Sequence, residues 1–252
     1  MLHIPSDDIN KTENLSEYWQ AFIDFCIEKN IDGIERWELW KACLNIEETH
    51  TWRKRFTWED YTQHLYDVAR NYINIHSDTK YITAEEIYAT LNHDNIEDTD
   101  DTFDTLKTAY WEIVALIVQV VSKHTWLDNY DKRLRDNEYI SRFQSIAFLQ
   151  KHIEEEAIIR WIVLKPYESL KLATIAIKLK WCDRNHNLAT EICISIKRAE
   201  HKRKQTIEDL LPVIKQVGNT RLTEGISQTI EQVWEDIRIS IERGCVVATI
   251  CD

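Results

Sequence analysis

Glycine and proline are scarce in this chain of 252 residues, which carries only 4 Gly and 3 Pro. At average usage of roughly 7% and 5%, a chain of this length would carry about 18 and 13 of them. Tight hairpins and strand corners depend on these two residues, so their scarcity predicts an almost entirely helical protein. Four glycines, at positions 33, 218, 225 and 244, also exclude the glycine-rich phosphate loops of Rossmann and P-loop proteins.

Zinc-type cysteine pairs and long apolar runs are missing as well. The six cysteines contain no C-x-x-C pair and no paired Cys/His spacing, so we interpret them as reduced thiols. The longest apolar run, residues 113–121, is interrupted by Gln119 and is far shorter than the roughly 18 residues that a membrane-spanning helix needs. The first fourteen residues lack the apolar segment of a signal peptide. We expect a cytoplasmic protein without membrane contact.

Basic residues are fewer than acidic residues. The chain has 31 Lys and Arg against 43 Asp and Glu, which gives a net charge of −12. Duplex nucleic-acid binders derive most of their affinity from Lys and Arg that neutralise phosphates. The composition therefore disfavours a nucleic-acid partner without excluding one.

Apolar residues recur at helical spacing along most of the chain. They predict a first helix that begins at about residue 14 or 16 and ends at about 30, and a second helix over about 34–44. A polar loop is expected over 47–55. Two further helices are expected to begin at Thr57 and at Thr83. Thr57 with Asp60 and Thr83 with Glu86 resemble capping boxes. A long helix is expected over 102–123 and a second long helical segment over 137–164, before Pro166. The acidic run 94–104 separates a Trp-rich amino-terminal helical region, residues 1–100, from residues 101–252; one continuous domain is the alternative.

Three helices of similar length are expected after Pro166, at about 168–181, 186–199 and 204–217, and a longer fourth helix is expected at about 220–243. Leu172-Ala173-Thr174 recurs as Leu188-Ala189-Thr190, and paired helices of this length imply a period near 34 residues. In these respects residues 168–243 resemble tetratricopeptide-like repeat proteins, although the Trp, Leu-Gly, Tyr, Ala and Pro pattern of that family is absent. The resemblance implies stacked hairpins with a groove for a peptide or a partner helix. The expected fold class is all-α, with a helical bundle followed by solenoid-like helical hairpins.

Five of the ten tryptophans lie in the first 60 residues, and most should be buried. Trp52 and Trp58, however, flank Arg53 and Arg55 in an expected loop. Interleaved aromatic and basic side chains are typical of contacts with a partner. The first functional hypothesis is therefore a non-enzymatic interaction or adaptor module that binds another protein and needs no cofactor.

Two short motifs support enzyme alternatives. Arg70-Asn71 followed by His76 resembles the motif of HEPN-domain ribonucleases, and the resemblance implies metal-independent RNA cleavage by Arg70 and His76 at a dimer interface. A histidine at the negative end of a helix dipole explains the same residues without catalysis.

The second motif, Asp100-Asp101-x-x-Asp104, resembles the D-D-x-x-D motif of class I terpene synthases and prenyl-chain enzymes. The resemblance implies Mg²⁺ held against a diphosphate by these carboxylates, with Asp183, Asn187 and Glu191 at the spacing of the second metal motif of that family. Acidic residues at the start of a helix explain the run equally well. Glu47-x-x-His50 and Cys182-x-x-x-His186 each lack a second pair of ligands, so we expect no metal centre from them.

Overall fold

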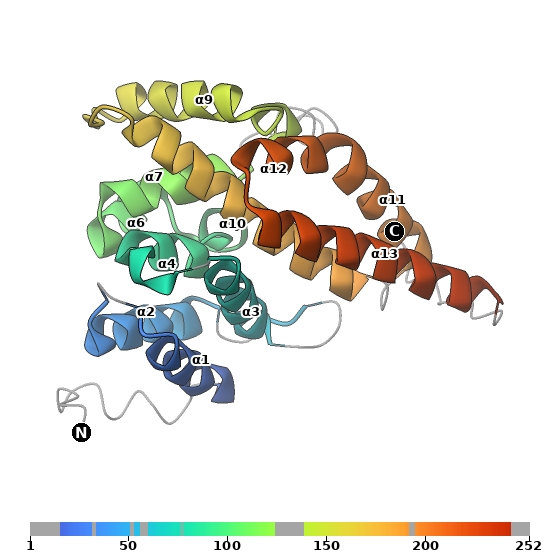
Figure 1. Cartoon of the computed structure of the whole chain (residues 1–252). Helices are drawn as coiled ribbons and strands as arrows, with labels where there is room; N and C mark the ends of the chain where they lie inside the picture. The colour runs from blue at the N-terminus through green and yellow to red at the C-terminus, as the bar shows by residue number, and fades with distance from the viewer. Residues whose placement is uncertain are drawn as a thin grey trace. The chain divides into compact units, whose positions relative to one another are not determined.

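A computed structural model describes residues 16–31, 34–50, 53–55, 60–76, 78–123, 139–191 and 195–242. Within these ranges every regular element is a helix, and the one extended pairing is an isolated bridge between Lys54 and Asp60 (Figure 1). The predicted all-α class is confirmed. None of the described helices is long and apolar enough to cross a bilayer.

The chain divides into two compact units, Met1–Val118 and Gln119–Asp252. The acidic run 94–104, at which the sequence suggested a boundary, lies inside the first unit. The described helices of this unit are α1 (Glu17–Glu28), α2 (Arg36–Thr49), α3 (Tyr61–Asn74), a short 3₁₀ helix (Thr79–Tyr81), α4 (Ala84–Leu91), α5 (Asn95–Asp98), α6 (Phe103–Tyr110) and most of α7 (Glu112–Val121).

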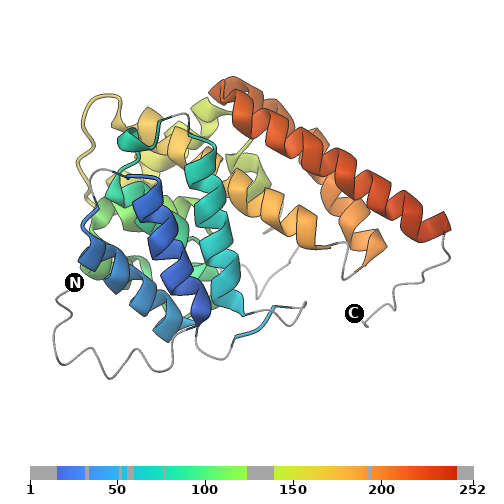
Figure 2. The same cartoon turned by 60° about the horizontal axis from the view of Figure 1, so that its bottom comes forward.

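Helix α3 is the centre of the first unit and packs against α1 and α4 (Figure 2). Its apolar face is formed by Leu65, Val68, Ala69 and Tyr72, all fully buried, at the spacing that places them on one side of a helix. Helix α2 packs in turn against α1 and α4. A buried α3 therefore gives the side chains on its first turn a fixed position.

Two start signals read from the sequence can be compared with the structure. At α4 the capping box is present, and the backbone N–H of Thr83 donates to Glu86 Oε2 at 3.0 Å. Helix α3 instead begins at Tyr61 after Asp60, and Thr57 lies outside the described residues. Helix α2 runs on to Thr49, so part of the expected polar loop 47–55 is helical.

The single helix expected over 102–123 is wrong, because the structure has two helices there, α6 and α7. They are separated at Trp111, whose φ of 80° cannot continue a right-handed helix. Neither glycine nor proline marks this break, so nothing local in the sequence indicated it.

The second unit contains α9 (Ile146–Ile159), α10 (Glu168–Glu191), α11 (Ile196–Gln205), a π-helical turn (Thr206–Leu210), α12 (Leu211–Val217) and α13 (Thr220–Glu242). Helix α10 packs against α9 and α13, and α11 also packs against α13. The side chains that α10 buries include Leu172, Ala173, Ala176 and Leu179.

The hairpin expected between 168–181 and 186–199 is also wrong. Helix α10 is continuous over 24 residues and passes through the segment that we expected to be a turn. Cys182 and Asp183 are both buried in it, and no glycine or proline interrupts it. The resemblance to tetratricopeptide-like repeats stays a prediction.

Near Pro212 the chain forms a π-helical turn and then α12, which ends at Gly218 as expected. Proline removes one backbone donor and its ring clashes with the preceding turn, which accounts for the widened hydrogen bonding at this point. Gly218 has a φ of 70°, the left-handed conformation that commonly terminates helices.

Candidate metal centre

Histidine 64 lies on the first turn of α3, one turn after Tyr61. Its side chain is 2% exposed, on the same side of the helix as the buried Leu65 and Val68. An imidazole on the buried face of an amphipathic helix needs a polar partner there. The partners come from the segment that follows α4.

That segment is His93-Asp94, between the end of α4 and the start of α5. Asn92 ends α4 and Asp94 precedes α5, with the N–H of Asp98 donating to the Asp94 carbonyl at 2.8 Å. His93 is 1% exposed. The tight connection between two helices thus places an imidazole and a carboxylate side by side.

The three side chains converge on one point. Asp94 Oδ2 lies 3.5 Å from His64 Nε2 and 3.3 Å from His93 Nε2. The two imidazole rings have centroids 5.4 Å apart. We call His64, His93 and Asp94 the His-His-Asp cluster.

Hydrogen bonding fixes the tautomer of His93. Its Nδ1 lies 2.8 Å from the carbonyl oxygen of Thr90, and a carbonyl can only accept, so Nδ1 carries the hydrogen. In the neutral ring the lone pair is then on Nε2, the atom that faces Asp94. A backbone carbonyl bound to Nδ1–H is the usual way in which proteins orient a metal-binding histidine.

Tyr61 connects the cluster to the surface. Its hydroxyl donates to Asp94 Oδ2 at 2.7 Å and lies 2.5 Å from Asp98 Oδ2. Burial first, and then the charges of the two carboxylates, raise the pKa of Tyr61 well above its ordinary value, so the phenol keeps its hydrogen. Asp98 Oδ1 in turn lies 3.9 Å from Arg53 Nη1. A chain of polar contacts therefore runs from Arg53 through Asp98 and Tyr61 to Asp94.

A second layer of side chains supports Tyr61. His50 stacks on its ring, with centroids 5.0 Å apart and planes inclined by 9°. Asn95 Oδ1 lies 3.1 Å from His50 Nε2, and the side-chain amide N–H of Asn95 donates to Asp101 Oδ2 at 2.8 Å. Burial lowers the pKa of His50 more than its hydrogen bond to Asn95 raises it, so His50 packs as a neutral ring.

The donor set of the His-His-Asp cluster fits a divalent transition metal. Two imidazole nitrogens and a carboxylate oxygen are the ligands that suit Mn²⁺, Fe²⁺ or Zn²⁺. All three side chains are buried or nearly so. Such a site provides three protein ligands and leaves room in the metal coordination shell for water or substrate.

Exchange of Tyr61 for phenylalanine is expected to weaken metal binding by about 10- to 100-fold, because Tyr61 holds the carboxylate of a ligand. Competition with a chromogenic chelator measures this affinity. The matched control is Tyr66→Phe, which removes a phenol–carboxylate bond of 3.0 Å to Glu47 in the same helix but outside the cluster. Equal metal affinities for the two variants would contradict a role of Tyr61 in the site.

Of the residues predicted from the sequence, those that the structure describes are not members of the His-His-Asp cluster. Trp52 and Trp58 are outside the described residues. Arg53 contacts Asp98, as above, and Arg55 is partly exposed. The predicted loop therefore does contribute a cation next to the cluster, although the sequence suggested a contact with a protein partner.

Arg70 and His76 have structural contacts. Arg70 Nη1 forms an ion pair of 3.1 Å with Asp67, and His76 Nδ1 lies 2.8 Å from the carbonyl oxygen of Tyr72. His76 follows the C-cap of α3, and its ring contacts a carbonyl of the last helical turn, as expected for a histidine at the negative end of a helix.

The three aspartates of the D-D-x-x-D motif do not gather into a ligand set. Asp101 accepts hydrogen bonds from Asn95 and Thr105, whereas Asp100 and Asp104 are exposed. Among the described residues, Asp100, Asp101 and Asp104 do not form a group of convergent ligands. Asp101 instead supports the second layer behind Tyr61.

In the second unit, Asp183 is a buried carboxylate in the middle of α10. Its Oδ2 lies 2.7 Å from Lys180 Nζ, and Asn187 donates to the same side chain. The spacing of Asp183 and Asn187 noted in the sequence therefore corresponds to a contact between successive helical turns. The side chain of Glu191 is outside the described residues.

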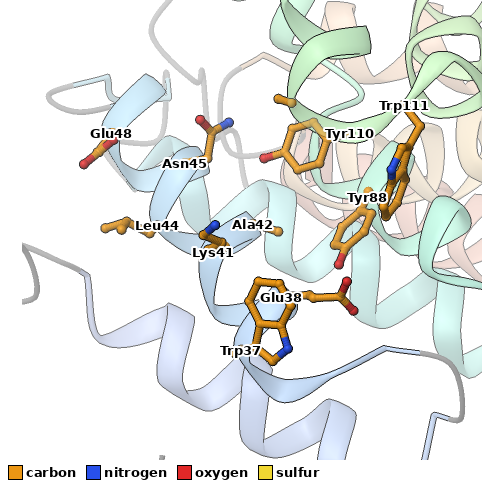
Figure 3. A pocket seen from close by; sticks show the side chains of 11 residues that line it. Trp37, Glu38, Lys41, Ala42, Leu44, Asn45, Glu48, Tyr88, Tyr110 and Trp111 are labelled. Carbon is orange, nitrogen blue, oxygen red and sulfur yellow. The ribbon is translucent and has the colours of Figure 1, made fainter. Parts of the chain in front are cut away.

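A pocket of about 390 Å³ in the first unit is lined by none of the cluster residues. Figure 3 shows side chains of α2, including Trp37 and Lys41, on one side of it and Tyr88 and Trp111 on the other. The rings of Tyr88 and Trp111 are in contact, with centroids 5.7 Å apart and planes inclined by 43°. The pocket holds no imidazole, so we place the chemistry at the cluster.

Comparison with known proteins gives two relatives, while no family model matches the chain. The chain is 25% identical over 178 residues, 71% of its length, to a protein of rice (Oryza sativa subsp. japonica) described as a probable chloroplastic GTP diphosphokinase. It is 36% identical over 86 residues, 34% of its length, to the guanosine-3′,5′-bis(diphosphate) 3′-pyrophosphohydrolase of Aquifex aeolicus (strain VF5). Both relatives are named as enzymes of guanine nucleotides. The matches span 22% of the rice protein and 12% of the Aquifex protein.

These relatives overturn the hypothesis of a non-enzymatic adaptor, which is wrong. They give no support to a HEPN-type ribonuclease or to a terpene-type diphosphate enzyme either. Sequence reasoning missed His64, His93, Asp94 and Tyr61. One signal was available: an adjacent His-Asp pair, followed by Glu97-Asp98, together with a histidine on the buried face of α3.

Proposed function

We propose that this chain is a metal-dependent phosphohydrolase that removes the 3′-diphosphate of guanosine 3′,5′-bis(diphosphate). The observation that carries the proposal is the convergence of His64 Nε2 and His93 Nε2 on Asp94 Oδ2. This donor set supports hydrolytic metal chemistry, and the relative with 36% identity is named for that hydrolysis.

His64, His93 and Asp94 would hold the metal. A divalent ion in such a site lowers the pKa of water and supplies a nucleophile at neutral pH. Tyr61 keeps Asp94 oriented through its hydroxyl, and Thr90 keeps His93 oriented through its carbonyl. Asp98, partly exposed and linked to Asp94 through Tyr61, is positioned to accept the proton of the attacking water.

The net charge of −12 repels a substrate with two diphosphates, so local cations are needed near the cluster. Arg53 is beside Asp98, and Lys54 pairs with Asp60 immediately before α3. A guanidinium binds phosphate oxygens in a bidentate manner. We assign Arg53 to the binding of a substrate phosphate.

Exchange of Arg53 for glutamine is expected to raise KM about 10-fold with a smaller effect on kcat, because the lost contact binds substrate without entering the chemistry. Steady-state kinetics measure both constants. Arg36→Gln is the matched control: Arg36 is similarly exposed and pairs with Asp24 at the same distance of 3.9 Å. A KM that changes equally in both variants would argue against this assignment.

Diphosphate transfer from a nucleoside triphosphate, suggested by the name of the rice relative, is the second candidate. Such transfer relies on Mg²⁺, which prefers oxygen ligands and keeps several waters. A cluster with two buried imidazoles favours softer metals. The donor set therefore supports hydrolysis over transfer.

The proposal is tested by incubating the chain with guanosine 3′,5′-bis(diphosphate) and Mn²⁺ and by resolving the products on an ion-exchange column. We expect GDP and pyrophosphate in equal amounts. Release from the 5′ side, or an unchanged substrate with Mn²⁺, Fe²⁺ and Zn²⁺ in turn, would contradict it.

A further inference from the structure

A large apolar surface lies at the connection between α9 and α10 in the second unit. Five side chains form it: Ile158, Ile159, Trp161, Val163 and Tyr167. Their exposed fractions are 74%, 67%, 93%, 90% and 85%. Figure 2 shows this connection, in gold, as a loop that extends beyond the helices it joins. We call these five residues the α9–α10 patch.

The backbone at Trp161 and Tyr167, the two aromatic residues of the patch, is in a strained conformation. The N–H of Ile162 donates to Ala157 O at 2.8 Å and that of Trp161 to Ile158 O at 3.2 Å, the pattern of a Schellman motif. Glycine usually occupies the left-handed position of this motif, but here Trp161 does so with a φ of 58°. Tyr167 has a φ of 64°. Bulky residues in this conformation are strained by about 1–2 kcal/mol each, and such strain is typical of functional surfaces.

The patch is too large for an ordinary monomer surface. Two aromatic side chains exposed to this degree offer on the order of 400 Å², and the three aliphatic ones bring the patch to on the order of 700 Å². The largest apolar patch of a typical monomer is about 300–600 Å². One partner in a stable complex buries about 800 Å², so the patch by itself approaches the area that a dimer requires.

A groove of about 640 Å³ adjoins the patch and shares Tyr167 with it. Glu154 and Lys165 are among its lining residues, so it carries charges of both signs. Tyr167 belongs both to the patch and to the lining of the groove, so a second copy that covers the patch also meets the groove. A two-fold symmetric contact pairs the same surfaces of both copies, and it would bring Glu154 of one copy toward Lys165 of the other. We propose that the α9–α10 patch is the surface through which two copies of this chain form a symmetric dimer.

Sedimentation velocity between about 1 and 100 μM tests the dimer. We expect a dimer for the unchanged chain, and a dissociation constant raised at least about 30-fold by Trp161→Gly and by Val163→Glu, because each removes or charges a central contact. Glycine relieves the φ of Trp161, so Trp161→Gly should keep or raise Tm, and loss of the dimer would not reflect unfolding. Tyr81→Glu is the control, since Tyr81 is 81% exposed but lies in the first unit.

Three outcomes would overturn the proposal. One is a monomer at every concentration, and another is a dimer that Trp161→Gly and Val163→Glu leave unchanged. The third is a monomer that floats with vesicles of phosphatidylcholine and phosphatidylglycerol, which would assign the patch to a membrane surface. None of these measurements depends on catalytic activity.

Discussion

Exchange of His64, His93 or Asp94 for alanine is expected to lower kcat/KM for the 3′-diphosphate hydrolysis by about a thousand-fold or more. Each of the three removes one of the converging ligand atoms, and loss of a ligand removes the ion that activates water. Kinetics with guanosine 3′,5′-bis(diphosphate), combined with metal analysis of the purified variants, measure activity and metal content together.

His76→Ala is the control for these variants. His76 also belongs to the α3 region and is hydrogen-bonded to a backbone carbonyl, but it is not part of the His-His-Asp cluster. We expect it to retain hydrolysis and metal. Full activity after loss of His64, with the fold intact by circular dichroism, would refute the site; loss of activity in His76→Ala alone would refute the assignment of roles.

Removal of divalent metal by a chelator is expected to abolish hydrolysis and to lower Tm, and Mn²⁺ or Zn²⁺ should restore both. An ion that binds only the folded chain stabilises it by about 2.7 kcal/mol at one hundred times its dissociation constant, which corresponds to a shift of about 5–10 °C for a protein of this size. The shift should shrink at acidic pH, because protons compete with the metal for imidazole nitrogens. Differential scanning fluorimetry measures it without any substrate.

The same melting experiment separates the cluster from other carboxylates. His93→Ala and Asp94→Asn should remove the metal-dependent shift, and Asp104→Asn, an exposed position on α6, should keep it. The absence of a shift in the unchanged chain with any of Mn²⁺, Zn²⁺, Fe²⁺ or Co²⁺ would contradict a metal centre, independently of whether the substrate is correct.

Local signals predicted those parts of the fold that depend on neighbours in sequence. The capping box at Thr83 and Glu86 joins residues within one helical turn, and Gly218 ends α12 through its own backbone conformation. Breaks without such residues were not predictable. Trp111 divides α6 from α7 although no glycine or proline stands there, and α10 continues through residues 182–186, where polar side chains suggested a turn.

The candidate site was beyond those local signals. The sequence indicated that Arg53 contacts a partner. It did not indicate that Arg53 pairs with Asp98, nor that Asp98 is linked through Tyr61 to the His-His-Asp cluster. The motifs that the sequence offered, Arg70 with His76 and the acidic run 100–104, are contiguous patterns whose described side chains mostly satisfy their own helices and turns. A histidine in α3 and a His-Asp pair after α4 form no contiguous motif, so their relation was not visible in the sequence.

The sequence by itself determined that this protein is helical. A chain with 4 glycines and 3 prolines has few residues that favour tight turns, and its apolar residues recur at helical spacing. Only the tertiary structure decided which imidazoles and carboxylates meet. Helix periodicity acts over a few residues, whereas a ligand set requires atoms within about 4 Å of one another from separate elements. That proximity arises when the apolar faces of α3 and α4 pack together and bury the polar side chains that lie at their ends.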